Sequence, residues 1–462
     1  MSTDFAAGDA REKSGHGTGK IRLRYFSFIF LLLTLSSQAR LQTKPGNDSL
    51  SGTVTLRACV DYALSHQPSV KKSLLDEEIT ERLISSKIAD WYPQLSFSAN
   101  IQHDPQLPWS VGVGLPPIAV GSRDASAGQV ILSQTIFNRD VLFASSTASD
   151  VRREMTQQTA GNKIEVAVDV SKAFYAVLVT QKDIEVLNED IVRLTRSFQE
   201  AYDRYKGGIA DKTDYQRATI SLNNAKAERK QNEDLLKARY ALLKEQMGCP
   251  PDTPLALASD DAQMERESIL DTVQSIHYEN RIEFQLLQTE RKLQEADLNY
   301  EEWSFLPTLT LYGNYSLNFF SEEYSQLYAK KYPSSYFNLQ LSFPIFQGGK
   351  RLEEISAARL ELDRFDYDIL SLKNAMNAEY VQALSDYKSN LNNYRVLKEN
   401  LDLARDVYQT VELQYKAGTK TYLEVITAET DLRAAQINRT NALYELLSSK
   451  LDVQRALGSL RY

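Results

Sequence analysis

Histidines, cysteines and glycine-rich loops most often carry catalytic or metal chemistry, and this chain has few of them. Beyond the expected N-terminal leader, His66, His103 and His277 lie far apart in unlike contexts and without metal-ligand spacing. The GGK segment at 348–350 lacks the spacing of a phosphate-binding loop, and no nucleophile elbow is present. We therefore expect no catalytic residues, no cofactor and no metal, and a protein that is not an enzyme.

The side chains best placed for polar chemistry lie instead in a stretch that occurs twice. Tyr205–Asp214 recurs as Tyr415–Glu424 about 210 residues later. The same offset persists to Gly248 and Gly458, each of which closes a long amphipathic run. A repeat of so long a period indicates that the whole chain is a duplicated unit.

Each copy of this stretch has the pattern of a helix, a short glycine turn and a second helix. Gly208 and Gly418 suit the left-handed position that ends the first helix. In the first copy, Thr213 and Asp214 can cap the second helix or complement the positive end of its dipole. Taken alone, either copy is also compatible with any antiparallel helix hairpin.

The amino-acid composition limits the kinds of protein to which these hairpins can belong. The chain has 462 residues, of which 42% are hydrophobic and 25% charged, and its net charge is −8. This is enough chain for two or three ordinary domains, and nothing indicates general disorder. The acidic balance argues against nucleic acid as a partner.

The N-terminal segment has the features of a secretory signal. Basic residues precede an apolar run at 25–35, and Ser37 and Ala39 then supply small residues for cleavage. We expect a signal peptide at 1–39, followed by a linker at 40–56. A membrane anchor is the alternative, but the apolar run is too short to span a bilayer as a helix.

Two segments change from helical spacing to strict alternation. In the first, Leu95, Phe97, Ala99 and Ile101 alternate with small polar residues, and the pattern returns within 307–346. Such alternation is typical of strands with one apolar and one polar face. Because the polar residues are small and the strand pairs are separated by long helical runs, the pattern favours a water-filled membrane barrel over a soluble sandwich.

Two proline-free runs predict helices of unusual length, near 138–206 and 350–416. A helix of this length is on the order of 100 Å long. In the second run, tyrosine or leucine recurs every seventh residue from Tyr380 to Tyr415, which is typical of a coiled-coil seam packed against partner helices. Stacked shorter helices are the alternative for the first run.

These patterns divide the chain into two similar halves, each with a helical segment, a strand pair and a long helical hairpin. The expected divisions are the signal peptide at 1–39, the linker at 40–56, a first helical segment at 57–92, a first β-hairpin at 93–137, a first helical hairpin at 138–248 with its tip near 207–214, an irregular connection at 249–270, a second helical segment at 271–306, a second β-hairpin at 307–346 and a second helical hairpin at 347–462 with its tip near 417–424.

The four expected strands cannot close a barrel by themselves. Membrane barrels have about eight strands or more and leave no open edge in lipid, so other copies of the chain must complete the sheet. A dimer would supply about eight strands and a trimer about twelve. The expected fold class is therefore mainly α with membrane β: long coiled-coil hairpins plus four strands for each chain.

The layout resembles the TolC-like outer-membrane efflux protein family over essentially the whole mature chain. The matching motifs are Val54–Ala63 with Gln67-Pro68, the helix-ending Tyr92-Pro93 and Leu306-Pro307, the segment Pro344–Gly349, and the tips at Gly208 and Gly418. The resemblance implies a homotrimer with a 12-stranded β-barrel in the outer membrane, continued through the periplasm by an α-helical barrel. It also implies an exit duct for tripartite efflux or type I secretion. The implied partners are outer-membrane lipid, a periplasmic adaptor and an inner-membrane pump of RND, ABC or MFS type.

The resemblance also implies that the tips form a periplasmic gate. Tyr415 and Lys420 occupy the inner-hairpin positions of the family's closing links, and Thr213 and Asp214 occupy the outer-hairpin positions. The expected contact is a charge-assisted one between Lys420 and Asp214, with the Tyr415 hydroxyl as a further donor. Lysine stands where the family has arginine, so bidentate geometry is lost.

Glu424 occupies a position where the family can carry an acidic ring that faces the pore. A second acid would be expected at Thr427 and is missing, so we expect a single ring that attracts cations. The alternative for Glu424 is a solvated acid that complements the start of a helix. The resemblance further implies that Gly208 and Gly418, with their flanks, form the adaptor-docking surface.

Two alternatives stay open at this point. A soluble periplasmic coiled-coil protein that resembles an adaptor would explain the hairpins but not the amphipathic strand pairs, and solubility without detergent would distinguish it. Cys59 and Cys249 could form a disulfide in an oxidising compartment, and the sequence does not decide whether they do.

Overall fold

The computed structural model describes residues 52–114, 116–258 and 261–460. The signal peptide expected at 1–39 and most of the linker expected at 40–56 lie outside these residues. Gly52–Tyr462 forms one compact unit. Among the described helices, none combines the length and the apolar character needed to cross a bilayer.

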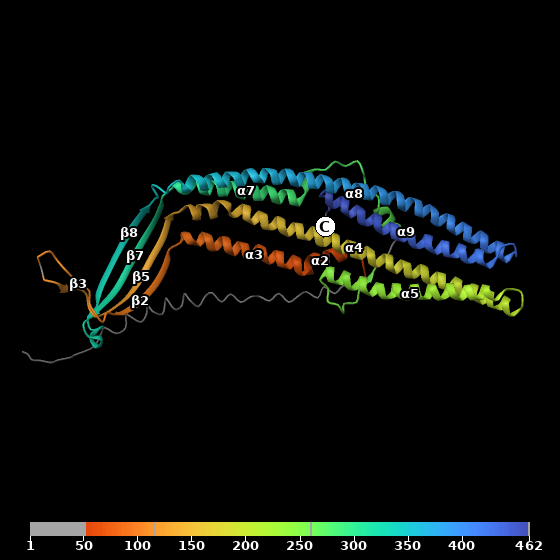
Figure 1. Ribbon diagram of the computed structural model, residues 1–462, viewed down its shortest axis with the longest axis horizontal. Coiled ribbons are helices and arrows are strands. Elements are labelled where there is room, and N and C mark those ends of the chain that lie inside the picture. Colours follow the sequence, from red (N-terminus) through yellow and green to blue (C-terminus); the bar gives the residue numbers. More distant parts are fainter. Residues whose placement is uncertain (1–51, 115, 259–260, 461–462) are drawn as a thin grey trace, which may run out of the picture. The chain divides into compact units, whose positions relative to one another are not determined.

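The unit consists of two halves with a similar order of long elements (Figure 1). The first half contains β1 (Thr53–Val54), α2 (Leu56–His66), α3 (Pro68–Ile88), η1 (Ala89–Trp91), β2 (Gln94–His103), β3 (Trp109–Ser110), β4 (Ile118–Ala119), β5 (Asp124–Phe137), α4 (Arg139–Lys206) and α5 (Lys212–Met247). The second half contains β6 (Ala256–Leu257), α6 (Asp261–Glu267), η2 (Tyr278–Asn280), α7 (Ile282–Glu302), η3 (Trp303–Phe305), β7 (Thr308–Ser321), η4 (Tyr324–Gln326), β8 (Tyr332–Ser342), α8 (Lys350–Lys416) and α9 (Tyr422–Ala456).

The four long strands form one antiparallel sheet in the order β2–β5–β7–β8. The central pair, β5 and β7, comes from different halves of the chain, so the sheet joins the two repeats. β2 and β8 are the edge strands, and all of their residues are exposed. Each edge therefore presents a row of unpaired backbone donors and acceptors.

One face of the sheet is apolar, as the alternation predicts. Phe97 lies opposite Val130, which in turn lies opposite Tyr315. Gly313 lies on the same face and leaves room for the Phe337 ring, because an added Cβ would come within 2.9 Å of that ring. The absence of a side chain at this position therefore lets β8 place a large aromatic residue on the apolar face.

The opposite face of the sheet is linked by polar side chains. The Gln129 amide donates a hydrogen bond of 2.9 Å to the Ser98 hydroxyl, and its carbonyl oxygen accepts one of 3.2 Å from Asn314. These bonds connect β2, β5 and β7. Small uncharged side chains can therefore satisfy one another on this face without ion pairs.

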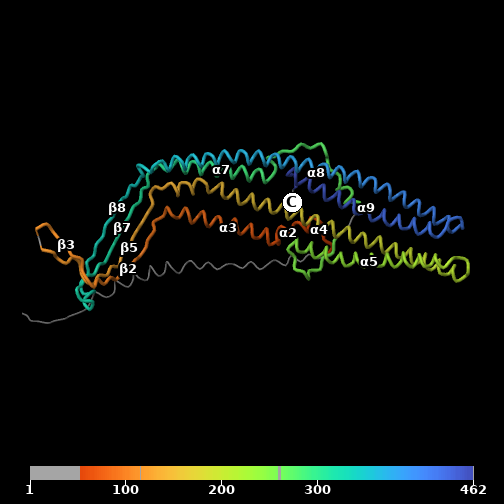
Figure 2. The backbone as a smooth tube through the Cα atoms, in the orientation of Figure 1, coloured from red at the N-terminus to blue at the C-terminus, as the bar shows by residue number. Residues whose placement is uncertain are grey.

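The two longest helices are uninterrupted, which confirms that prediction. α4 has 68 residues and α8 has 67, and each ends at a hairpin turn. Stacked shorter helices in the first half are therefore excluded. The trace in Figure 2 shows that the α4–α5 and α8–α9 turns lie at the same end of the unit, and the sheet lies at the other.

The second helical segment, expected at 271–306, begins later than predicted, because α7 begins only at Ile282. The preceding backbone is held by side chains of α8 in place of helical hydrogen bonds. The Tyr387 hydroxyl accepts a bond of 2.8 Å from the Leu270 N–H and donates one of 3.0 Å to the Ser268 carbonyl. A side chain from a distant helix thus satisfies backbone groups that a local pattern assigns to a helix.

The seven-residue tyrosine stripe of α8 therefore does more than pack against helices. Tyr380, like its neighbour Tyr387, uses its hydroxyl on the irregular connection and donates 2.5 Å to the Gln274 carbonyl. Further along, the Tyr394 hydroxyl accepts 3.2 Å from Arg439 of α9. The stripe packs as predicted, and its hydroxyls also fix the connection between the two halves.

In each half, a glycine at the end of the last helix packs closely against the backbone of an earlier segment of the same half. Gly248 has a φ of 69° and Gly458 a φ of 64°. A Cβ added at Gly248 would lie 2.8 Å from Gln67 Cα and the His66 carbonyl, and one added at Gly458 would lie 2.7 Å from the Asn280 carbonyl. Only glycine allows both the left-handed turn and this close backbone approach.

Candidate functional site at the hairpin tips

The first tip is a two-glycine turn between α4 and α5. Gly208 has a φ of 72°, the left-handed conformation that commonly ends a helix. Asp211 then caps α5, because its carboxylate accepts 2.8 Å from the Thr213 N–H and 3.1 Å from the Thr213 hydroxyl. These two bonds lower the pKa of Asp211.

Thr213 does not cap this helix, contrary to one of the roles expected for it. The backbone is extended at Asp211, with φ −75° and ψ 150°, and α5 already includes Lys212. Thr213 therefore lies inside the first turn and donates to the cap. Asp214 takes the other expected role, because an acid in the first turn complements the helix dipole.

The second tip repeats the turn with different capping chemistry. Gly418 has a φ of 78°, and Thr421 caps α9 in a capping box with Glu424. The Thr421 N–H donates 2.8 Å to the Glu424 carboxylate, and Lys420 Nζ lies 2.5 Å from the other carboxylate oxygen. The Lys420 bond, followed by the two bonds from Thr421, lowers the pKa of Glu424 to about 2. Glu424 is therefore a fixed anion at the start of α9.

Aromatic packing joins the two tips. Tyr422 of α9 is 4% exposed and forms an apolar cluster with Ala201 of α4 and Ala218 of α5. The Arg204 guanidinium of α4 lies 4.7 Å from the centre of the Tyr415 ring of α8. The two hairpins of one chain are thus held together by a buried tyrosine and a cation–π contact.

The expected links between the gate residues of the two hairpins are not formed among the described residues of the single chain. Burial raises the pKa of Tyr415, the Arg204 charge opposes this rise, and the Asp214 charge adds to it. Lys420 is paired with Glu424 within its own hairpin. A contact of Lys420 with Asp214 therefore stays a prediction for the assembled protein.

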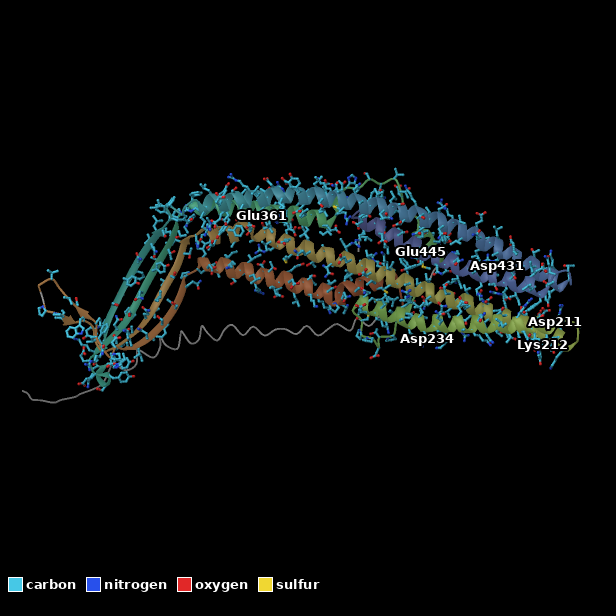
Figure 3. All side chains as sticks on the ribbon, viewed as in Figure 1. Asp211, Lys212, Asp234, Glu361, Asp431 and Glu445 are labelled. Atoms are coloured by element: carbon cyan, nitrogen blue, oxygen red, sulfur yellow. The ribbon has the colours of Figure 1, made fainter. Side chains whose placement is uncertain are left out.

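Gly208 and Gly418 lie at open positions on the chain. A Cβ added at either glycine would have no neighbouring atom within 4 Å. Ile209, beside the first glycine, is 79% exposed. Figure 3 labels Asp211 and Lys212 at this end of α5.

Two residues at the tips were missed by reasoning from sequence. Tyr422 could have been found, because it lies seven residues after Tyr415 and continues the stripe of α8 across the turn. Arg204 gives no comparable signal, since a basic residue in the last turn of a helix ordinarily complements its dipole. Its place over the Tyr415 ring follows from the packing of two hairpins.

Comparisons with known proteins agree with this architecture. The chain is 20% identical over 416 residues to outer membrane protein TolC of Vibrio cholerae, which covers 87% of this chain and 90% of that protein. It is 22% identical over 422 residues to outer membrane protein OprJ of Pseudomonas aeruginosa, covering 87% and 84%. The crystal structure of outer membrane protein VceC from Vibrio cholerae aligns with a TM-score of 0.69 at 14% identity, over 87% of this chain and 96% of that one.

A family match extends over most of the chain. The outer membrane efflux protein family matches residues 59–248 and 276–459, which include both hairpins and both strand pairs. The two matched segments correspond to the two halves of the fold. The chain belongs to the outer membrane efflux protein family.

Proposed function

We propose that the two hairpin tips of this chain form the closable periplasmic entrance of an outer-membrane exit duct. The protein is a channel of the outer membrane with a helical extension in the periplasm. It works as a homotrimer with a periplasmic adaptor and an inner-membrane pump, as in tripartite efflux and type I secretion. Substrates pass through it chemically unchanged.

The sheet supports a trimeric duct. β2 and β8 each leave an unpaired edge, and an open edge is not tolerated in the hydrocarbon region of a bilayer. Pairing the edges of three chains closes the sheet and leaves no backbone group unsatisfied. The apolar face that carries Phe97, Tyr315 and Phe337 then meets lipid, and the polar face lines the pore.

The observation that carries the gate is the contact between hairpins at the tips. Tyr422 is buried against both helices of the first hairpin, and Tyr415 lies under Arg204. Opening the entrance requires the second hairpin to move away from the first, which would expose this cluster. An exposed polar pair contributes only about 0–1 kcal/mol, but three symmetry-related copies at a constriction bias a two-state gate together.

Lys420 and Asp214 add a second element to this proposal. In the single chain, Lys420 is held by Glu424 of its own hairpin. In the closed trimer, Lys420 exchanges this partner for Asp214, and Thr213 lies beside the new contact. The exchange changes no net charge, so it can be reversed at small cost when the entrance opens.

The divisions of the chain follow from this assignment. The segments 93–137 and 307–346 form the membrane barrel. The hairpins at 138–248 and 347–462, together with the segments 57–92 and 271–306, form the periplasmic barrel. The connection at 249–270 lies around the middle of the periplasmic barrel.

The tips also form the adaptor-docking surface in this proposal. Gly208 and Gly418 are open in the chain, so a bulky side chain would alter that surface without filling the interior. Gly208→Trp should weaken capture of the purified adaptor, whereas Gly208→Asn, which tolerates the left-handed backbone, should not. Equal capture by both variants would argue against docking at this tip.

The gate is tested by single-channel recording in planar bilayers. Replacing Asp214 and Lys420 together with alanine should raise the conductance of the trimer, because the closed entrance loses its link. The matched control replaces Asp234 and Lys230 with alanine. These two residues form an ion pair of 3.1 Å on α5, away from the tips (Figure 3).

The control should leave conductance unchanged. An unchanged conductance in the tip variant would overturn the gate assignment, although it would leave the fold and the duct in place.

A further inference from the structure

Acidic side chains occupy core positions in the seam between the two hairpins. On α9, Glu429 lies seven residues after Tyr422, which is two helical turns and roughly 10 Å from the tip. It is 2% exposed, and Asp190 of α4, on the other side of the seam, is fully buried. Buried carboxylates are rare unless they are paired, so these two need an explanation.

Within the described part of the chain, the two arginines of the seam direct their hydrogen bonds to Asp190. Arg433 Nη1 of α9 donates 3.0 Å to one carboxylate oxygen, and Arg193 Nη2 of α4 donates 3.1 Å to the other. Among the described residues, both oxygens of Glu429 lack a hydrogen-bond partner. Its nearest cationic atom is Arg193 Nε, at 3.6 Å.

The helices packed around Glu429 also carry acidic and hydroxyl side chains close to it. Among the described residues, they bring no cation to Glu429 besides Arg193 and Arg433. Glu412 and Tyr408 face it from α8, and Glu412 is itself bound to Lys416 at 2.7 Å. From α5, Glu228 lies 4.0 Å from Arg433 Nε. Tyr422 on α9 is also close. The two arginines therefore carry charge enough for both buried carboxylates, but among the described residues Glu429 receives no hydrogen bond from them.

A proton on Glu429 would remove this conflict. An ionised carboxylate that is buried without hydrogen bonds is strongly disfavoured, whereas a protonated one is neutral and can donate to a neighbouring carboxylate. Burial, and then the Asp190 charge, raise the pKa of Glu429 to about 7, against the lowering by Arg193 and Arg433. A carboxyl group with a pKa of about 7 changes charge near neutral pH.

We propose that Glu429 is a proton-operated latch between the first and second helical hairpins. When it is protonated, it seats against Asp190 and holds α9 on α4. When it is ionised, it becomes a buried anion that receives no hydrogen bond and lies beside a second anion, and the seam above the tips loosens. The latch rests on the proposed gate, because it controls the same hairpin movement from a separate position.

The direction of the pH dependence follows from the raised pKa. Between the ordinary value of 4.5 and about 7, the folded chain holds a proton on Glu429 that the unfolded chain has lost. The contribution of this group to stability is therefore greatest below that interval and declines as pH rises through it. The latch closes at lower pH and opens at higher pH.

Conductance of the trimer in planar bilayers tests the proposal, at about pH 6 and about pH 8.5. The wild type should conduct more at the higher pH. Glu429→Gln mimics the protonated side chain, so its conductance should stay at the low value at both pH values. Asp431→Asn, an exposed acid on the same helix labelled in Figure 3, should retain the wild-type step.

A wild type without the step, or a Glu429→Gln variant that keeps it, would overturn the latch and leave the channel standing. Arg193→Gln supplies a second variant: loss of the nearest cation should move the step to higher pH, and an unmoved step contradicts the proposal.

Thermal unfolding of the same trimers in detergent does not require conduction. The unfolding midpoint of the wild type should fall relative to Glu429→Gln as pH rises from about 4.5 to about 7. A constant difference between the two proteins would show that Glu429 does not titrate in this interval. This readout therefore separates failure of the latch from failure of the channel.

Discussion

Lys420 Nζ lies 2.5 Å from Glu424 Oε1, within a single turn at the start of α9. Two of the five residues expected to act at the gate thus neutralise each other in one chain. Glu424 is also the partner of Thr421 in the capping box, so its carboxylate has a structural role that does not depend on a pore. Experiments at this tip must separate the charge of Glu424 from its capping function.

Glu424→Gln separates these roles, because glutamine at the same position can still complete a capping box. If three Glu424 carboxylates form a ring in the pore, the variant should lose cation preference, seen as a smaller reversal potential in a salt gradient. Asp431→Asn is the control on the same helix and should keep the wild-type potential. An unchanged reversal potential in Glu424→Gln would leave the residue as a helix cap without a role in selectivity.

Thr421→Ala should fray the first turn of α9. The loss of an N-cap hydroxyl costs about 1 kcal/mol, which corresponds to about fivefold faster local hydrogen exchange. Thr427→Ala is the matched control, since the Thr427 hydroxyl donates only to the Leu423 carbonyl of its own helix. Similar exchange rates at the tip in the two variants would contradict the capping role of Thr421.

Gly248→Ala and Gly208→Ala distinguish backbone strain from backbone collision. Both glycines have a positive φ, which costs alanine roughly 1–2 kcal/mol. Only at Gly248 would the new Cβ lie 2.8 Å from the backbone of His66 and Gln67. Gly248→Ala should therefore lower the thermal unfolding midpoint of the trimer clearly more than Gly208→Ala. If both variants lowered the unfolding midpoint equally, the α2–α3 junction would be able to move away from the end of α5.

The two cysteines should differ in reactivity. Both are free thiols in the structure, so the disulfide that the sequence left open is not formed there. Burial, with a further contribution from nearby Cys249, raises the pKa of the Cys59 thiol to about 12. A maleimide should therefore modify Cys249 much faster than Cys59 in the folded trimer, and Cys249→Ser should remove the fast phase. Labelling that appears only after reduction would instead show that the two thiols pair in the periplasm.

Much of the fold could be predicted because its signals are local and repeated. Proline-free runs gave α4 and α8, strict alternation gave the strands, and glycines at a fixed offset gave the two turns. The start of α7 at Ile282 could not be predicted from the sequence. The backbone before it is held by the Tyr387 hydroxyl, which belongs to a helix more than 100 residues away. Local patterns carry no information about such a partner.

The site was less accessible to sequence than the fold. The gate links expected for Tyr415, Lys420 and Asp214 stay predictions, and the position of Arg204 depends on how two hairpins pack. Glu429 was not singled out, because an acid within an amphipathic helix ordinarily indicates a solvated face. Only the structure shows that it occupies a seam position after Tyr422 and lacks a hydrogen-bond partner. The assembled partners of Lys420 depend on the trimer, which one chain does not determine.

The open edges of β2 and β8 also have a genetic consequence. A chain with one damaged edge still offers its other edge to normal neighbours, so it enters a trimer and prevents that barrel from closing. If damaged and intact chains are made in equal amounts and mix freely, roughly one trimer in eight contains intact chains only. Edge mutations should therefore be dominant negative, whereas mutations that stop the chain from folding should be recessive.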